Sequence, residues 1–166
     1  MNNYKVKIGF LDLLVERRHT HAVTFKPNPS GRGLSLDALH SLFWKVHMLV
    51  DRALLGSRFN LPDRAAFRSE AIGIVEGLPD CGHLHGSFKV QPEHWAKFES
   101  LFADGGTRET RHGIWRKLVP HGTAVVEPIY EAEGWHDYTF KQVWKTSDSD
   151  RIVIPPLPLL PPVPRV

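Results

Sequence analysis

The amino-acid sequence predicts a single α+β domain. Three observations indicate this class: short stretches that alternate apolar and polar residues, stretches with apolar residues at helical spacing, and turn-forming residues between them. The 166 residues and the hydrophobic content of 42% suffice for one core but not for two sizeable ones. We therefore expect one domain over residues 1–150, followed by a tail over residues 151–166.

The first part of the chain is expected to contain one strand and one long helix. Residues 22–26 alternate as a half-buried strand does, and the turn-rich residues 27–33 end it. Ser35 is suited to cap a helix that ends at Gly56, with apolar residues every three or four positions in between. For residues 4–15 the pattern does not decide between helix and strand.

The second part is expected to add three strands and two helices. Residues 71–76 and 83–90 are rich in strand-forming residues on either side of a turn, so they are predicted to pair antiparallel. Residues 123–130 form another candidate strand. The helices are predicted over residues 93–103 and from Gly134 to about Lys145.

The end of the chain and its composition set further expectations. Proline is dense in residues 151–166, which disfavours helix and ladder pairing, so an extended or disordered tail is predicted. No apolar run approaches the roughly 20 residues that a membrane span requires, and the single cysteine, Cys81, excludes an internal disulfide. These features predict a soluble, cytoplasmic protein. The net charge of +3 permits a polyanionic partner without requiring one.

The chemistry is expected on residues 76–88. Successive side chains of a strand alternate between its faces, so His83 and His85 would share one face. If this strand pairs closely with the preceding one, Glu76 lies opposite His83 on that same face. Two neutral imidazoles and one carboxylate can hold a divalent cation and leave positions open for water or phosphate oxygens. With 10 histidines in the chain, such a pair also arises by chance.

Three motifs in order resemble the HUH endonucleases, in particular the rolling-circle replication initiators (Rep proteins) of plasmids, phages and single-stranded DNA viruses. The motifs are Ala22-Val23-Thr24-Phe25, His83-Leu84-His85 and Tyr138-x-x-Lys141. Glu76 matches the acidic third ligand of many such enzymes. The resemblance spans about residues 19–146. The chain has one such tyrosine motif and no Walker-type phosphate loop, so it resembles a nicking domain alone.

This resemblance implies a central antiparallel sheet of the ferredoxin-like or RRM-like kind, with helices packed against it. It also implies a Mg²⁺ or Mn²⁺ ion on Glu76, His83 and His85, and site-specific nicking of single-stranded DNA or an origin hairpin. A phenol has a pKa of about 10, so attack on a phosphodiester requires its deprotonation and a polarised phosphate. Tyr138 would form a 5′-phosphotyrosine linkage, and Lys141 would hold the phosphate or lower the pKa of the phenol.

Other functions remain open from the sequence. One is a metal-free two-histidine phosphoesterase, for which His85-Gly86-Ser87 would be one element, although His19-Thr20-His21 has the wrong spacing for the other. Another is a non-catalytic DNA- or protein-binding module on the same fold, with the proline tail bound to a partner. Within the nickase hypothesis, Tyr130 is the alternative nucleophile. The sequence does not decide the oligomeric state.

A DNA-binding surface would need cations that track the backbone and aromatic platforms that stack on bases. Trp115 and Trp135 are candidate platforms. The candidate cations are Arg17, Arg18, Lys26, Arg64, Arg68, Arg111, Arg116 and Lys117. The sequence assigns none of these side chains to a site.

Overall fold

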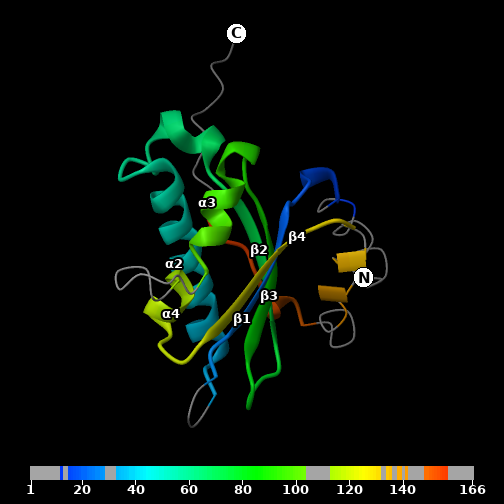
Figure 1. The fold of residues 1–166 in the computed structure, drawn as a ribbon. Helices are drawn as coiled ribbons and strands as arrows, with labels where there is room; N and C mark the ends of the chain where they lie inside the picture. The colour runs from blue at the N-terminus through cyan, green and yellow to red at the C-terminus, as the bar shows by residue number, and fades with distance from the viewer. Residues whose placement is uncertain are drawn as a thin grey trace.

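A five-stranded antiparallel sheet forms the centre of the fold, in the order β4-β1-β3-β2-β5 (Figure 1). The computed structural model describes residues 12, 15–28, 33–103, 113–131, 134–135, 138–139, 141 and 148–156. The strands are β1 (His21–Lys26), β2 (Glu70–Glu76), β3 (His83–Lys89), β4 (Thr123–Pro128) and β5 (Ile152–Val153). This sheet and its flanking helices confirm the predicted α+β class with a central antiparallel sheet.

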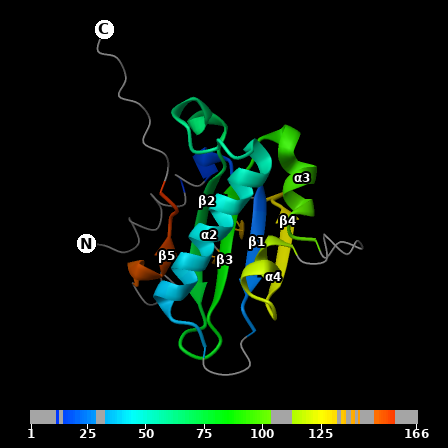
Figure 2. The same cartoon turned by 90° about the vertical axis from the view of Figure 1, so that its left-hand side faces the viewer.

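Helices cover one face of the sheet. They are α2 (Leu36–Leu55), α3 (Trp95–Ser100) and α4 (Ile114–Leu118). In Figure 2, α2 crosses the sheet, while α3 and α4 lie toward β1 and β4. The first four strands and the helices between them follow the β-α-β-β-α-β order of ferredoxin-like folds. No helix among the described residues is both long and apolar enough to cross a membrane.

The long helix α2 begins and ends where its capping residues predict. The Ser35 hydroxyl oxygen accepts a hydrogen bond from the Ala38 N–H at 3.2 Å, which satisfies one of the free donors of the first turn. Gly56 ends the helix with a φ of 87°, a left-handed value that favours glycine. The predicted helix from Ser35 to Gly56 is therefore confirmed.

Phe43 brings α2 close to the middle of the sheet. Gly73 of β2 and Gly86 of β3 are paired neighbours on the covered face. A Cβ at Gly73 would lie 3.0 Å from the Phe43 ring, and one at Gly86 would lie 3.3 Å from it. The two glycines thus make room for a fully buried aromatic ring. Because the apolar side chains of β3 face α2, its histidines are left to the opposite face.

A buried polar network joins α2 to the beginning of β2. Asp51 is fully buried and accepts hydrogen bonds from the Ser69 N–H at 2.9 Å, the Ser69 hydroxyl at 2.7 Å and Arg68 Nε at 2.6 Å. The His47 ring donates from Nε2 to the Ser69 carbonyl oxygen at 2.8 Å. This network fixes the start of β2, the strand that ends in Glu76. The Arg68 guanidinium is engaged with Asp51, so its role as a DNA-tracking cation is not supported.

Two predicted boundaries were wrong. Residues 152–153 were assigned to the proline tail, but they form β5, which pairs with β2 through Gly73 and Ile74. Val153 is buried, so its apolar side chain explains why the chain returns to the sheet before the prolines. The helix predicted over residues 93–103 divides into a 3-10 turn, Pro92–His94, and the short α3. The remaining tail, residues 157–166, lies outside the described residues.

Candidate metal centre

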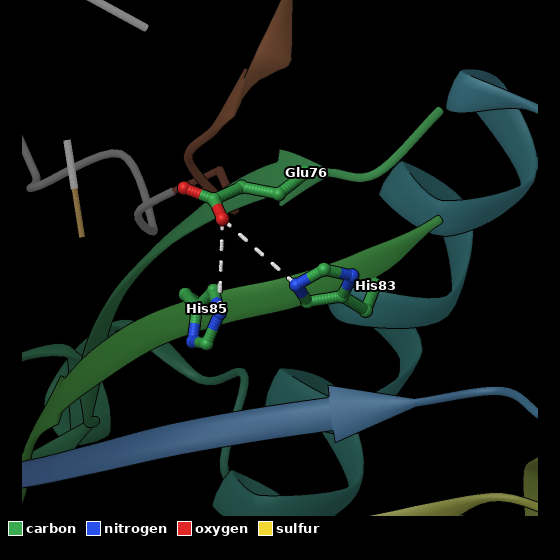
Figure 3. Close-up of side chains that lie close together, drawn as sticks. All are labelled: Glu76, His83 and His85. Atoms are coloured by element: carbon green, nitrogen blue, oxygen red, sulfur yellow. Dashed lines mark ion pairs between the residues drawn. The ribbon is translucent and has the colours of Figure 1, made fainter. Parts of the chain in front are cut away.

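Glu76, His83 and His85 meet on the sheet face opposite α2 (Figure 3). Glu76 pairs with His83 in the β2–β3 ladder, which is the register predicted from the turn. The Glu76 Oε2 atom lies 3.9 Å from Nε2 of His83 and 3.9 Å from Nε2 of His85. One ligand atom from each residue lies within 4.8 Å of the other two. The three side chains are therefore close enough to bind one metal ion.

Both histidine rings are held with Nε2 toward Glu76. The Nδ1 atom of His83 lies 2.9 Å from the Cys81 carbonyl oxygen. Because a carbonyl oxygen only accepts, the Nδ1 atom of His83 carries a proton, and in the neutral form of the ring the Nε2 lone pair is free. The Nδ1 atom of His85 is hydrogen-bonded to the Thr24 hydroxyl at 3.0 Å. Partners of this kind fix the orientation of metal-binding histidines.

Glu76 is a buried carboxylate with one unused oxygen. Burial raises the pKa of this carboxyl above its ordinary value, and the positive charges of His83, Lys141 and Arg151 oppose that rise. Its Oε1 atom is buried and has no hydrogen-bond partner among the described residues. A buried charged oxygen without a partner is costly. A cation bound between the three ligand residues would offset that cost, so the donor set fits a divalent ion.

His85 is neutral at neutral pH. Burial is the main cause that lowers its pKa to about 4, and the positive charges of His83, Lys26 and Lys141 lower it further. Metal binding requires the deprotonated imidazole. The neutral His85 ring can therefore bind a metal ion without a net loss of a proton.

Tyr138 and Lys141 lie beside this centre. The described residues of the segment 134–141 are helical, and in Figure 1 they lie across the sheet from α2. The Tyr138 ring contacts the His85 ring edge to face, with 6.0 Å between centroids, and its side chain is half-exposed. Lys141 Nζ lies 3.7 Å from the centroid of the Tyr138 ring. The structure thus brings all five predicted site residues to one region of the sheet face opposite α2.

Further aromatic residues lie beside Tyr138, on its side of the metal centre. Trp135 lies 6.4 Å from His85 and 6.2 Å from Tyr138 between ring centroids. A hollow of about 390 Å³ lies beside them, lined by Trp135, Tyr138, Ala22 and residues 127–131. The alternative nucleophile, Tyr130, is 93% exposed in the wall of this hollow.

Two other sequence-based candidates lie elsewhere. Trp115, predicted as a base-stacking platform, is fully buried: its ring stacks on Phe25 at 4.9 Å, and its Nε1 donates to the Lys26 carbonyl oxygen. That prediction was wrong because α4 packs this side chain into the core. His21, considered for a phosphoesterase, is fully buried and contacts Phe98 on the helix-covered face, away from His85.

Thr24 has a role at the site that sequence reasoning did not assign. Its hydroxyl is hydrogen-bonded to Nδ1 of His85. The sequence pattern around Thr24 could have indicated this position. Thr24 pairs with His85 across β1 and β3, and it is a polar residue between Val23 and Phe25, whose side chains are buried. Alternation alone therefore places its hydroxyl on the same face as the histidines.

Together, the fold and the three ligand residues define an α+β sheet domain with a candidate two-histidine, one-carboxylate metal centre on the sheet face opposite α2. Comparisons with protein-family models, with curated proteins and with solved structures find no match to the chain. A functional assignment therefore depends on the chemistry of the site itself.

Proposed function

We propose that the protein is a metal-dependent endonuclease that nicks single-stranded DNA and rejoins strands through a tyrosine-linked intermediate, as Rep-like HUH nicking domains do. One observation carries the proposal. The Tyr138 ring, which bears a nucleophilic hydroxyl, lies against His85, a member of a three-residue metal-binding group. The proposed role is initiation of rolling-circle replication of a plasmid or related element in the cytoplasm.

The metal-binding group in this proposal consists of Glu76, His83 and His85, holding Mg²⁺ or Mn²⁺. When bound, such an ion polarises a phosphate oxygen and makes the phosphorus more electrophilic. The neutral His85 would supply an uncharged nitrogen ligand to it, and the buried Glu76 would supply a charged oxygen ligand. The hydrogen bond of His83 to the Cys81 carbonyl oxygen and that of His85 with the Thr24 hydroxyl keep both imidazoles oriented, so little reorganisation accompanies binding.

Tyr138 is the proposed nucleophile. Its phenolic oxygen attacks the scissile phosphorus, the bond from phosphorus to the 3′-oxygen breaks, and that oxygen takes the electron pair and a proton to become a 3′-hydroxyl. The phenolic proton passes to solvent or a nearby base. The new bond is a 5′-phosphotyrosine, which conserves the phosphodiester for rejoining. Tyr138 is half-exposed, which leaves room for a polymer substrate to reach its side chain.

Lys141 and Trp135 are proposed to hold the substrate. Lys141 lies over the Tyr138 ring, and its positive charge also acts on Glu76 and His85. A cation at this point favours both the phenolate and a bound phosphate. Trp135 presents an aromatic surface next to Tyr138, and stacking on such surfaces is a sequence-tolerant way to hold single-stranded bases.

The test is a covalent trapping experiment. Labelled single-stranded oligonucleotide pools are incubated with the protein and Mn²⁺, and we expect a labelled band that survives SDS. Tyr138→Phe should abolish the band, and EDTA should prevent it. Tyr130→Phe is the matched control, because Tyr130 borders the same hollow and should be dispensable.

Other outcomes separate the competing functions. A band that persists in Tyr138→Phe and disappears in Tyr130→Phe would move the nucleophile to Tyr130. Binding of the pools without any band would favour the non-catalytic module. Phosphodiester cleavage that continues in EDTA would favour the metal-free phosphoesterase, in which His19 is buried against Ser87 and His21 is buried on the other face.

A further inference from the structure

A pocket of about 370 Å³ adjoins the candidate metal centre at its His83 end. One wall is formed by residues 26–28, which follow from β1, and the other by residues 80–83, which lead into β3. His83 belongs to both the pocket and the metal-binding group. A ligand in the pocket would therefore lie next to whatever the metal centre binds.

The pocket and Tyr138 lie at opposite ends of the centre. Along the face of β3 opposite α2, His83 borders the pocket, and His85 contacts Tyr138. Ser87 comes next and pairs with Ala22, which lines the hollow beside Tyr138. Alternate residues of a strand lie about 7 Å apart. The order along the sheet is thus pocket, metal-binding group, nucleophile and second hollow.

One wall of the pocket, residues 26–28, is held in place by contacts with α4 and the residues before and in β4. The Lys26 carbonyl oxygen accepts a hydrogen bond from buried Trp115 at 3.1 Å. The Asn28 amide donates to the His121 carbonyl oxygen at 3.3 Å and to the Thr123 hydroxyl at 3.2 Å. This wall is therefore in place before a ligand arrives, which lowers the entropy cost of binding.

Lys26 supplies a positive charge at this pocket. It follows Thr24 by two positions on β1, so its side chain lies on the same sheet face as Thr24 and the two histidines. It is exposed, and it forms no ion pair with a carboxylate of the described residues. An unpaired cation next to a metal-binding group suits a phosphate. Asp80, on the opposite wall, offers acceptors that suit the amino group of a base.

The geometry of in-line displacement indicates which part of a DNA strand would lie in the pocket. The attacking and leaving oxygens lie on opposite sides of the phosphorus in phosphoryl transfer. With Tyr138 as nucleophile, the leaving 3′-oxygen faces the His83 end. We propose that this pocket binds the nucleotide immediately 5′ of the scissile phosphate, with Lys26 on a phosphate of that upstream strand. This inference rests on the proposed nickase function.

The upstream strand is the part that leaves with a free 3′-hydroxyl, so its retention controls rejoining. Lys26 is therefore a positioning residue: its loss should weaken binding of the upstream strand and should reduce rejoining more than cleavage. The covalent 5′-phosphotyrosine holds the downstream strand irrespective of Lys26.

The experiment compares Lys26→Ala, Lys26→Arg and Lys45→Ala. Lys45 is an exposed lysine on α2, on the other side of the sheet, and serves as the matched control. Anisotropy of labelled single-stranded pools is measured in EDTA over a range of salt. We expect about tenfold weaker binding for Lys26→Ala, with a salt slope smaller by about 0.7, and wild-type behaviour for Lys45→Ala.

A second measurement addresses the direction of the strand. The oligonucleotide sequence recovered from the covalent band is synthesised with and without an abasic site immediately 5′ of the nick. The abasic site should weaken binding of this oligonucleotide to the wild type. It should have little further effect on binding to Lys26→Ala, which has already lost its contact with the upstream strand. Rejoining to an added 3′-hydroxyl strand should fall in Lys26→Ala and recover in Lys26→Arg.

The outcomes distinguish this inference from the proposed function. Equal binding by Lys26→Ala and Lys45→Ala would overturn the inference, as would sensitivity confined to abasic sites 3′ of the nick. If the wild type forms no covalent band, the nickase proposal fails. In that case the anisotropy comparison still decides whether Lys26 binds a DNA strand.

Discussion

Replacing Glu76 by Gln should change stability in opposite directions with and without metal. The substitution removes the carboxylate of the metal-binding group but keeps the size of the side chain. Without metal, Glu76 carries a buried charge whose Oε1 has no described partner, and burial raises its pKa. A neutral amide avoids that desolvation cost. The metal-free variant should therefore be as stable as the wild type, or more stable by about 1 kcal/mol.

With metal, the wild type gains stability that the variant cannot. At a free Mn²⁺ concentration 100 times the Kd, binding to the folded state stabilises it by about 2.7 kcal/mol. For a chain of 166 residues, each kcal/mol corresponds to about 2–4 °C in Tm, so the wild-type Tm should rise by about 5–11 °C. Glu76→Gln should show no rise at the same Mn²⁺ concentration.

The assay is calorimetric unfolding in EDTA and across an Mn²⁺ titration, with Glu70→Gln as control. Glu70 lies on the same face of β2, six residues before Glu76, but it pairs with Arg17 and Lys89 instead of the histidines. Glu70→Gln should keep the full Mn²⁺ response. The reasoning would be refuted by a wild-type response in Glu76→Gln, or by equal loss of the response in both variants.

Three further predictions concern the scaffold. Asp51→Asn should lower the free energy of unfolding by about 3 kcal/mol in urea titrations, because it breaks a buried charged network; a change below about 1 kcal/mol would contradict that role. Phe43→Ala should lower it by about 3–5 kcal/mol in the same assay, whereas a near-neutral effect would mean that the sheet does not need this ring. Burial lowers the folded-state pKa of His21, His47 and His85 below 6.5, so at these three residues the unfolded chain binds more protons than the folded chain as pH falls. The stability that these histidines contribute should be complete above about pH 6.5 and decline toward about pH 4, less steeply in His85→Gln. A urea midpoint with the same pH dependence in the wild type and in His85→Gln would contradict this.

The sequence predicted most of what positions the site. Alternation on β3 placed His83 and His85 on one face, and the short turn set the register that brings Glu76 opposite His83. These are local properties, with a period of two and a tight connection, so they can be read from a few residues. Helix α2 could also be predicted from local sequence, because its N-cap, its apolar spacing and its terminal Gly56 all lie in one stretch.

Features that depend on distant packing could not be predicted. Strand β5 is only two residues long and is followed by prolines, so nothing local distinguishes it from a tail. Asp51 meets Arg68 and Ser69 only because α2 and β2 fold together, and neither spacing nor composition indicates that network. Trp115 has the aromatic side chain that a stacking platform requires, but it is buried because α4 packs it against the core. Burial by tertiary contacts is decided by the whole fold.

The most direct measurement of the central claim is the chemical identity of the residue that carries DNA. The protein is incubated with single-stranded oligonucleotide pools and Mn²⁺, digested, and mapped by tandem mass spectrometry. The account predicts a nucleotide attached through its 5′-phosphate to Tyr138. Attachment to Tyr130 or another residue, or no covalent nucleotide under conditions in which Mn²⁺ stabilises the wild type, would contradict it.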